Sequence, residues 1–132
     1  MPTVLIVDDS ESVRISVRAL FEAEPDFTVI GEAVNGLDAI AKAEELLPEL
    51  IVLDLSMPIM NGLEAADTLK SISPNTPIFV LTAHGGPEVD RAARAAGIDA
   101  VYSKGDNLQK MVGDARAIFA TSKRHRGAAR GK

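Results

Sequence analysis

Three aspartates, a threonine and a lysine each stand at or just after the end of a short apolar run in this sequence. Asp8 and Asp9 follow the first run, Asp54 the third, Thr82 the fourth and Lys104 the fifth. Taken singly, each has an ordinary explanation as a helix cap or a surface group. Together, three carboxylates and one ammonium leave excess negative charge, which a hard divalent cation with oxygen ligands would relieve. With no His or Cys nearby to suit zinc, the set fits magnesium best.

The five apolar runs predict parallel strands that are separated by helices. Short β-branched runs alternate with longer segments of helical period, which is typical of an α/β sheet covered by helices. The expected strands are residues 4–7, 27–30, 50–53, 78–81 and 100–102. Right-handed crossovers bring the carboxyl ends of all parallel strands to one edge, where ligands bind in such folds. The five polar residues are therefore expected to converge.

Each intervening helix is expected to bury one apolar face, with the third helix at about 63–71. The inner faces expected for the other four are Val13, Val17, Leu20 and Phe21; Leu37, Ile40, Ala41 and Leu47; Val89, Ala92, Ala93 and Ala96; and Leu108, Met111, Val112, Ala115, Ile118 and Phe119. The alanines of the fourth helix bury little area, at about 25 cal/mol per Å². That helix should therefore be the most loosely held.

The composition predicts one soluble, cytoplasmic domain. The chain has 132 residues, of which 46% are hydrophobic, enough for a single core. No apolar run approaches the roughly 18 residues of a spanning helix, and no leader pattern is present, so no membrane partner is expected. The absence of cysteine excludes disulfides, thiolate metal sites and cysteine catalysis.

The two ends of the chain differ in charge. Residues 1–120, the expected domain, carry 9 basic and 19 acidic residues, whereas residues 121–132 carry five Lys or Arg and no acid. An acidic body repels phosphates, so no direct nucleic-acid binding by the body is expected. The basic tail is interpreted as an extension of the last helix. The start of a linker to a DNA-binding domain, or a patch for an acidic partner, are the alternatives.

Five motifs in order resemble the receiver domain of two-component response regulators. They are Val7-Asp8-Asp9, Leu53-Asp54-Leu55-Ser56-Met57-Pro58, Asn61-Gly62, Leu81-Thr82-Ala83 and Ser103-Lys104. The resemblance extends from residue 3 to about residue 120. It implies a flavodoxin-like (βα)5 fold, in which a five-stranded parallel sheet of order 2-1-3-4-5 has helices on both faces.

The resemblance also implies a phosphoryl-transfer role for the converging residues. Asp54 would accept a phosphoryl group from a histidine kinase or a histidine phosphotransfer protein. The carboxylates of Asp9 and Asp54, the backbone carbonyl of Ser56 and, mainly through water, Asp8 would hold Mg²⁺, with Mn²⁺ as an alternative. Lys104 would pair with Asp54 and then with the phosphoryl oxygens.

The residues that would respond to phosphorylation follow from the same resemblance. The Thr82 hydroxyl would move toward the phosphoryl group and draw in the loop that begins at Ala83, together with the fourth helix. This would change the surface of the fourth helix, fifth strand and fifth helix, where a protein target, an attached effector domain or a second phosphorylated copy would bind. Ser56 and His84 occupy positions that tune hydrolysis in the family, although a solvent-facing histidine is the simpler interpretation.

Two positions depart from the usual receiver pattern. Receivers commonly carry an aromatic residue three places before the lysine, where this chain has Val101. Tyr102 lies one place later and so on the opposite face of the strand. Gly105 stands where many members have a cis proline, and a trans bond is expected because a cis bond before a non-proline costs about 3 kcal/mol.

The sequence pattern is compatible with three functions from different classes. A non-enzymatic signalling receiver, either freestanding or the receiver half of a helix-turn-helix DNA-binding regulator, is the leading hypothesis. A magnesium-dependent aspartyl phosphohydrolase is the alternative, but such enzymes usually carry a second acid two residues after the nucleophile, where this chain has Ser56. A receiver fold that no longer signals is disfavoured because the whole set of polar residues is present.

Overall fold

The structure is a computed structural model that describes residues 2–55, 61–83, 85–105 and 107–130, the last ten of these by their backbone alone. One five-stranded parallel sheet forms its centre, with strand order β2-β1-β3-β4-β5. The strands are β1 (Thr3–Val7), β2 (Thr28–Ala33), β3 (Leu50–Leu53), β4 (Ile78–Thr82) and β5 (Ala100–Ser103). The predicted order is confirmed, and the second strand lies further along the chain than the sequence pattern indicated.

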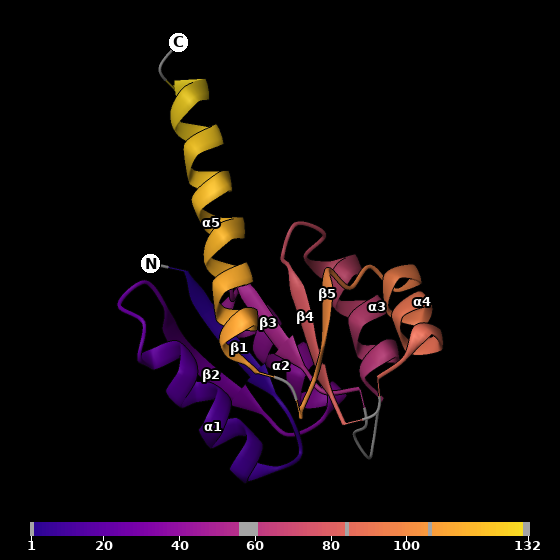
Figure 1. Ribbon diagram of the computed structural model, residues 1–132. Coiled ribbons are helices and arrows are strands. Elements are labelled where there is room, and N and C mark those ends of the chain that lie inside the picture. The colour runs from indigo at the N-terminus through magenta and orange to yellow at the C-terminus, as the bar shows by residue number, and fades with distance from the viewer. Residues whose placement is uncertain (1, 56–60, 84, 106, 131–132) are drawn as a thin grey trace.

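Five helices cover both faces of the sheet (Figure 1). They are α1 (Glu11–Glu22), α2 (Gly36–Leu46), α3 (Gly62–Ile72), α4 (Pro87–Ala95) and α5 (Gln109–Arg130). Helices α1 and α5 pack on one face, and α2, α3 and α4 on the other. In Figure 1, α5 continues well beyond the sheet toward the C-terminus. Among the described residues, no helix combines the length and the apolar character needed to cross a membrane.

The strands divide their side chains between two hydrophobic cores. Because successive strand residues point to opposite faces, Leu5 and Val7 enter the core under α2, α3 and α4, whereas Val4 and Ile6 enter the core under α1 and α5. Both cores are needed because a parallel sheet with helices on both faces is buried throughout. This explains why the inner strands β1, β3 and β4 are almost wholly apolar, whereas the edge strand β2 contains Glu32 and is only partly buried.

The predicted inner face of α2 is wrong. Leu37 is 54% exposed, Leu47 is 70% exposed and Ala41 is exposed, and of the four predicted residues only Ile40 packs against the core. The residues that face the sheet are Ala39 and Ala43. Small residues on this face let the helix lie close to the sheet, whereas the sequence pattern favoured the larger aliphatic side chains. Leu47 is the C-cap and has a left-handed backbone, which ends the helix.

The other helices agree with the predicted faces apart from one residue. In α5, Ile118 is 37% exposed, so it lies at the margin of the helix face that was expected to be buried. In α4, Ala93 is buried and Val89, Ala92 and Ala96 are half-buried, which confirms a thin contact with the sheet. The N-cap residue of α4 is Gly86, which has no side chain that could accept a capping hydrogen bond. The described peptide bonds are all trans, including the one before Gly105.

Candidate functional site

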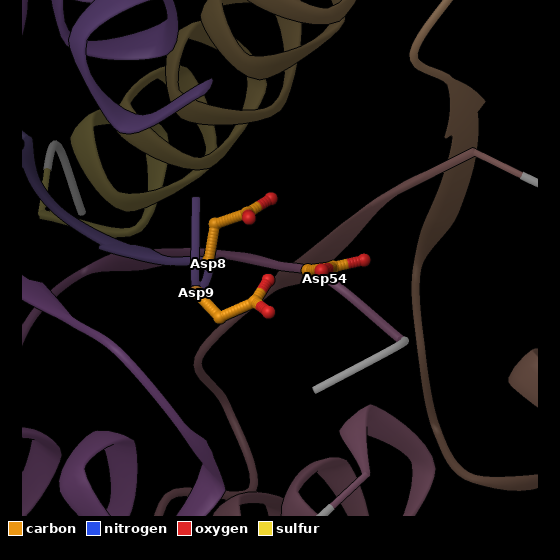
Figure 2. A group of neighbouring side chains, drawn as sticks. All are labelled: Asp8, Asp9 and Asp54. Atoms are coloured by element: carbon orange, nitrogen blue, oxygen red, sulfur yellow. The ribbon is translucent and has the colours of Figure 1, made fainter. Parts of the chain in front are cut away.

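Asp8, Asp9 and Asp54 form a cluster of carboxylates at the carboxyl edge of the sheet (Figure 2). One carboxylate oxygen from each lies within 4.8 Å of the others. Asp8 and Asp54 are buried, at 2% and 3% exposure, whereas Asp9 is exposed. Burying two carboxylates this close together is costly unless a cation or hydrogen-bond donors lie beside them.

The backbone ladder of the sheet brings Asp8 next to Asp54. Val7 of β1 pairs with Leu53 of β3, and the amide of Asp54 donates to the Val7 carbonyl over 2.9 Å. The amide of Asp8 donates to the Ala33 carbonyl of β2 over 3.0 Å. Both aspartates thus continue hydrogen-bonded strands by one residue. Their side chains are held on rigid elements, as the convergence of strand ends predicts.

Lys104 supplies a positively charged side chain to the site. Its Nζ lies 3.0 Å from Asp8 Oδ2 and 3.6 Å from Asp54 Oδ2, so it contacts both carboxylates and is nearer to Asp8. Its backbone amide donates to the Thr82 carbonyl over 2.8 Å, which fixes the end of β5 against β4. Burial lowers the pKa of Lys104, but the hydrogen bond to Asp8 and the charge of Asp54 outweigh it and raise the pKa overall. The amine is therefore charged at neutral pH.

The remaining residues predicted for the site lie around this cluster or outside the described part of the chain. Thr82 ends β4 and is 2% exposed, and Ala83 beside it is exposed. Ser56 and His84 lie outside the described residues, so the metal-ligand role expected for the Ser56 carbonyl and the tuning roles of both residues stay predictions.

Val101 and Tyr102 occupy opposite faces of β5, as strand alternation predicts. Val101 packs against the core under α2, α3 and α4, whereas Tyr102 lies in the core under α5 with its ring centroid 5.6 Å from that of Phe79. The Tyr102 hydroxyl donates to Asp114 of α5 over 2.7 Å. Burial and the bond to Asp114 raise the pKa of Tyr102 well above its usual range.

Two residues that contact the site backbone were missed as contributors to the site. Gly62 begins α3, and its amide donates to the Leu55 carbonyl over 2.9 Å. A Cβ at this position would lie 2.6 Å from Leu55 Cα, so only glycine fits beside the backbone that follows Asp54. Arg14 donates from Nη1 to the Asp8 carbonyl over 2.7 Å. The Asn61-Gly62 motif marks the first contact, whereas the contact of Arg14 with Asp8 has no signal in the local sequence.

Comparison with known proteins decides the family. Residues 4–116 match the family model of the response regulator receiver domain. The chain belongs to this family. Receiver domains are signalling domains of two-component systems, and they interact with histidine kinases and with effector or target proteins.

Curated relatives of this receiver domain are longer proteins. The chain is 45% identical over 96 residues to the nitrate/nitrite response regulator protein NarL of Escherichia coli, covering 71% of the chain and 44% of NarL. It is 39% identical over 98 residues to a protein-glutamate methylesterase/protein-glutamine glutaminase of Methanosarcina acetivorans, covering 72% of the chain and 28% of that protein. The chain therefore spans about half the length, or less, of these relatives.

Solved structures of receiver domains share the fold. A LuxR-family two-component response regulator from Aurantimonas superposes with a TM-score of 0.86 at 28% identity, over 92% of this chain and 86% of that one. The chemotaxis protein CheY4 of Vibrio cholerae superposes with a TM-score of 0.80 at 30% identity, over 89% of this chain and 98% of that one.

The donor set of the cluster fits magnesium. Receiver domains bind Mg²⁺ at a group of aspartates, and Asp8, Asp9 and Asp54 form such a group here. Three carboxylates with one nearby ammonium leave net negative charge at the strand ends, and hard oxygen ligands suit Mg²⁺. The exposure of Asp9 leaves one side of the cluster open to water, which Mg²⁺ retains in part when it binds to proteins.

Proposed function

We propose that Asp54 accepts a phosphoryl group from a histidine kinase or a histidine phosphotransfer protein, in a reaction that requires Mg²⁺. One observation carries this proposal. The Asp54 carboxylate is 3% exposed, lies beside Asp8 and Asp9, and is 3.6 Å from the ammonium of Lys104, at the carboxyl edge of a receiver sheet. A nucleophilic carboxylate with neighbouring groups that neutralise charge is what phosphoryl transfer needs, because positioning and electrostatics supply most of its catalysis.

The transfer exchanges one bond to phosphorus for another. A carboxylate oxygen of Asp54 attacks the phosphorus of a phosphohistidine, an O–P bond forms, and the N–P bond breaks. The imidazole nitrogen leaves and takes up a proton. Lys104 is already within 3.6 Å of Asp54 and would move from the carboxylate to the incoming phosphoryl oxygens. The ion held by Asp9 and Asp54 would supply positive charge to the same oxygens.

Thr82 is proposed to respond to phosphorylation of Asp54. It ends β4 beside Ser103 of β5 and is followed directly by the segment that leads to α4. A hydrogen bond from its hydroxyl to the phosphoryl group would draw that segment inward. Because α4 is anchored chiefly through Ala93, a small displacement of that segment can shift the helix. The surface formed by α4, β5 and α5 would then change and bind a partner.

Phosphorylation of the purified chain tests this function. Acetyl phosphate with Mg²⁺ should add about 80 Da, the mass of one phosphoryl group, to the intact protein. Asp54→Asn should abolish the addition. Asp67→Asn, which changes an exposed aspartate of α3, should leave it intact and serves as the matched control. Labelling of Asp54→Asn equal to that of the unmodified chain would refute the assignment.

A second function is that of the receiver half of a DNA-binding transcriptional regulator. Its support is the 45% identity to NarL, of which the chain covers 44%, and the likeness to a LuxR-family regulator. Phosphorylation would then act through dimerisation. Light scattering with Mg²⁺ and beryllofluoride, which mimics the phosphoryl group, should show a dimer for the unmodified chain and a monomer for Asp54→Asn. A monomer in both cases would count against control of DNA binding through dimerisation.

A further inference from the structure

Arg14 links the backbone of Asp8, which follows β1, to Glu32 of the neighbouring strand β2. The residue lies in the first turns of α1, and its side chain is 14% exposed. Its Nε donates to Glu32 Oε1 over 2.9 Å, and its Nη1 donates to the backbone carbonyl of Asp8 over 2.7 Å. The planar guanidinium thus makes two directed hydrogen bonds at once, which a single ammonium could not make in the same geometry.

Glu32 is itself held in place, so that it can orient Arg14. Arg18, one turn further along α1, donates from Nη1 to Glu32 Oε2 over 2.6 Å. Lys42 of α2 donates from Nζ to the Glu32 backbone carbonyl over 2.6 Å. Each carboxylate oxygen of Glu32 therefore binds a different arginine. Glu32 offsets part of the charge of Arg14, and the directed hydrogen bond to the Asp8 carbonyl makes the expected effect of Arg14 on the site chiefly geometric.

The contact with Asp8 is made to the peptide group that precedes Asp9. The Asp8 carbonyl belongs to the peptide group that joins Asp8 to Asp9, and a planar peptide turns as one unit. Arg14 holds the oxygen of this group, while the Asp8 amide binds Ala33 and the Asp8 side chain accepts from the amide of Ser10 over 2.9 Å. Within the described parts of the chain, no hydrogen bond is made to the exposed carboxylate of Asp9. Its direction therefore depends on the backbone that Arg14 holds.

We propose that Arg14 is a positioning residue for the metal site, which it serves by fixing the peptide between Asp8 and Asp9 so that Asp9 faces Asp54. The proposal rests on the proposed function, because it assumes that the aspartate cluster binds a divalent cation. Groups that orient metal ligands commonly change metal affinity by 10- to 100-fold when they are removed. In this role Arg14 would hold the backbone of Asp8 without itself being a metal ligand.

Titration of the unphosphorylated chain with Mn²⁺, followed by electron paramagnetic resonance, tests the proposal without measuring activity. Arg14→Gln removes the contact with the Asp8 carbonyl and should weaken Mn²⁺ binding by about tenfold. Removal of a positive charge near the cluster would by itself strengthen cation binding, so the sign of the change separates positioning from electrostatics. Unchanged or tighter binding by Arg14→Gln would overturn the proposal.

Arg18→Gln is the matched control. It removes an arginine from the same carboxylate of Glu32 and changes the net charge equally, but Arg18 makes no contact with Asp8. Its Mn²⁺ affinity should remain within about twofold of that of the unmodified chain, which is the small effect expected of an exposed charge. Equal losses in both variants would show that the effect comes from Glu32 or from net charge, and would contradict a positioning role.

The stability of the variants is measured in parallel by thermal unfolding in EDTA. If Arg14→Gln does not fold, Arg14→Lys carries the test, because it keeps the charge and loses the two-armed geometry; it too should bind Mn²⁺ more weakly than Arg18→Lys. Absence of Mn²⁺ binding by the unmodified chain would refute the magnesium site of the proposed function, and the role of Arg14 with it. Normal binding by the unmodified chain and by Arg14→Gln would refute only the role of Arg14.

Discussion

Replacing Gly62 with alanine should destabilise the protein and disturb the backbone that follows Asp54. The added Cβ would lie 2.6 Å from Leu55 Cα and 3.0 Å from the Asp54 carbonyl carbon, both of them backbone atoms that no side-chain rotation can move away. The start of α3 or the chain after β3 must therefore shift. Overpacking of this kind costs about 2 kcal/mol. For a chain of this size, that corresponds to a fall of about 8 °C in Tm.

Gly113→Ala is the matched control for this prediction. Gly113 lies within α5, and among the described residues no heavy atom outside its chain neighbours and the backbone of its own helix lies within 4 Å of the position that its Cβ would take. Alanine in a helix interior is more favourable than glycine by about 0.5–1 kcal/mol, so this variant should unfold at the same or a higher temperature. Thermal unfolding followed by circular dichroism measures both variants. A Gly62→Ala protein with unchanged Tm, or equal losses in both variants, would refute the steric argument.

The displacement should also reach the site. Because the added Cβ would press on the backbone carbonyl of Asp54 itself, Gly62→Ala should be phosphorylated by acetyl phosphate more slowly than the Gly113→Ala control. A displacement of about 1 Å can lower a rate by about 100-fold when a reaction depends on positioning. Equal phosphorylation rates for the two variants would show that the turn after Asp54 can adjust without moving the carboxylate.

Three further predictions concern single interactions. Tyr102→Phe removes the hydrogen bond to Asp114 and should lower the free energy of unfolding in urea by about 1 kcal/mol; no change would mean that the bond has no net value. The pKa of Glu32 is lowered because its hydrogen bonds to two arginines outweigh burial, so its stabilising effect should be present at pH 7 and lost as the pH falls below about 4.5. Glu32→Gln should therefore be less stable than the unmodified chain at pH 7 and equal to it at low pH; a constant difference would contradict this. Saturating Mg²⁺ should raise the Tm of the unmodified chain and not that of Asp9→Ala, since ligand at 100 times Kd stabilises a fold by about 2.7 kcal/mol.

The carboxyl ends of β1, β3, β4 and β5 could be predicted from the sequence because there an apolar run meets a polar residue; β2 has no such boundary and continues through Glu32 to Ala33. Asp8, Asp54, Thr82 and Lys104 were placed at one edge by this reasoning alone, and the structure brings them together there. The parallel topology makes the convergence independent of side-chain detail. Strand order was implied only by the resemblance to receiver domains, because the order of parallel strands leaves no local pattern.

Features that depend on packing between distant segments could not be predicted. Helix α2 turns its small residues, Ala39 and Ala43, toward the sheet, and only the space available there favours them over Leu37. The nearer contact of Lys104 with Asp8 depends on side-chain conformation. The bond between Arg14 and Glu32 joins residues 18 positions apart and has no periodic signal.

Direct identification of the phosphorylated residue tests the central claim most directly. After treatment with acetyl phosphate and Mg²⁺, borohydride reduction converts an aspartyl phosphate to homoserine, which peptide mass spectrometry can locate. Homoserine should appear at position 54 and at no other aspartate, and should be absent when Mg²⁺ is omitted. Homoserine at Asp8 or Asp9, or an unmodified Asp54 in a chain that has gained about 80 Da, would contradict the assignment of Asp54 as the phosphoacceptor.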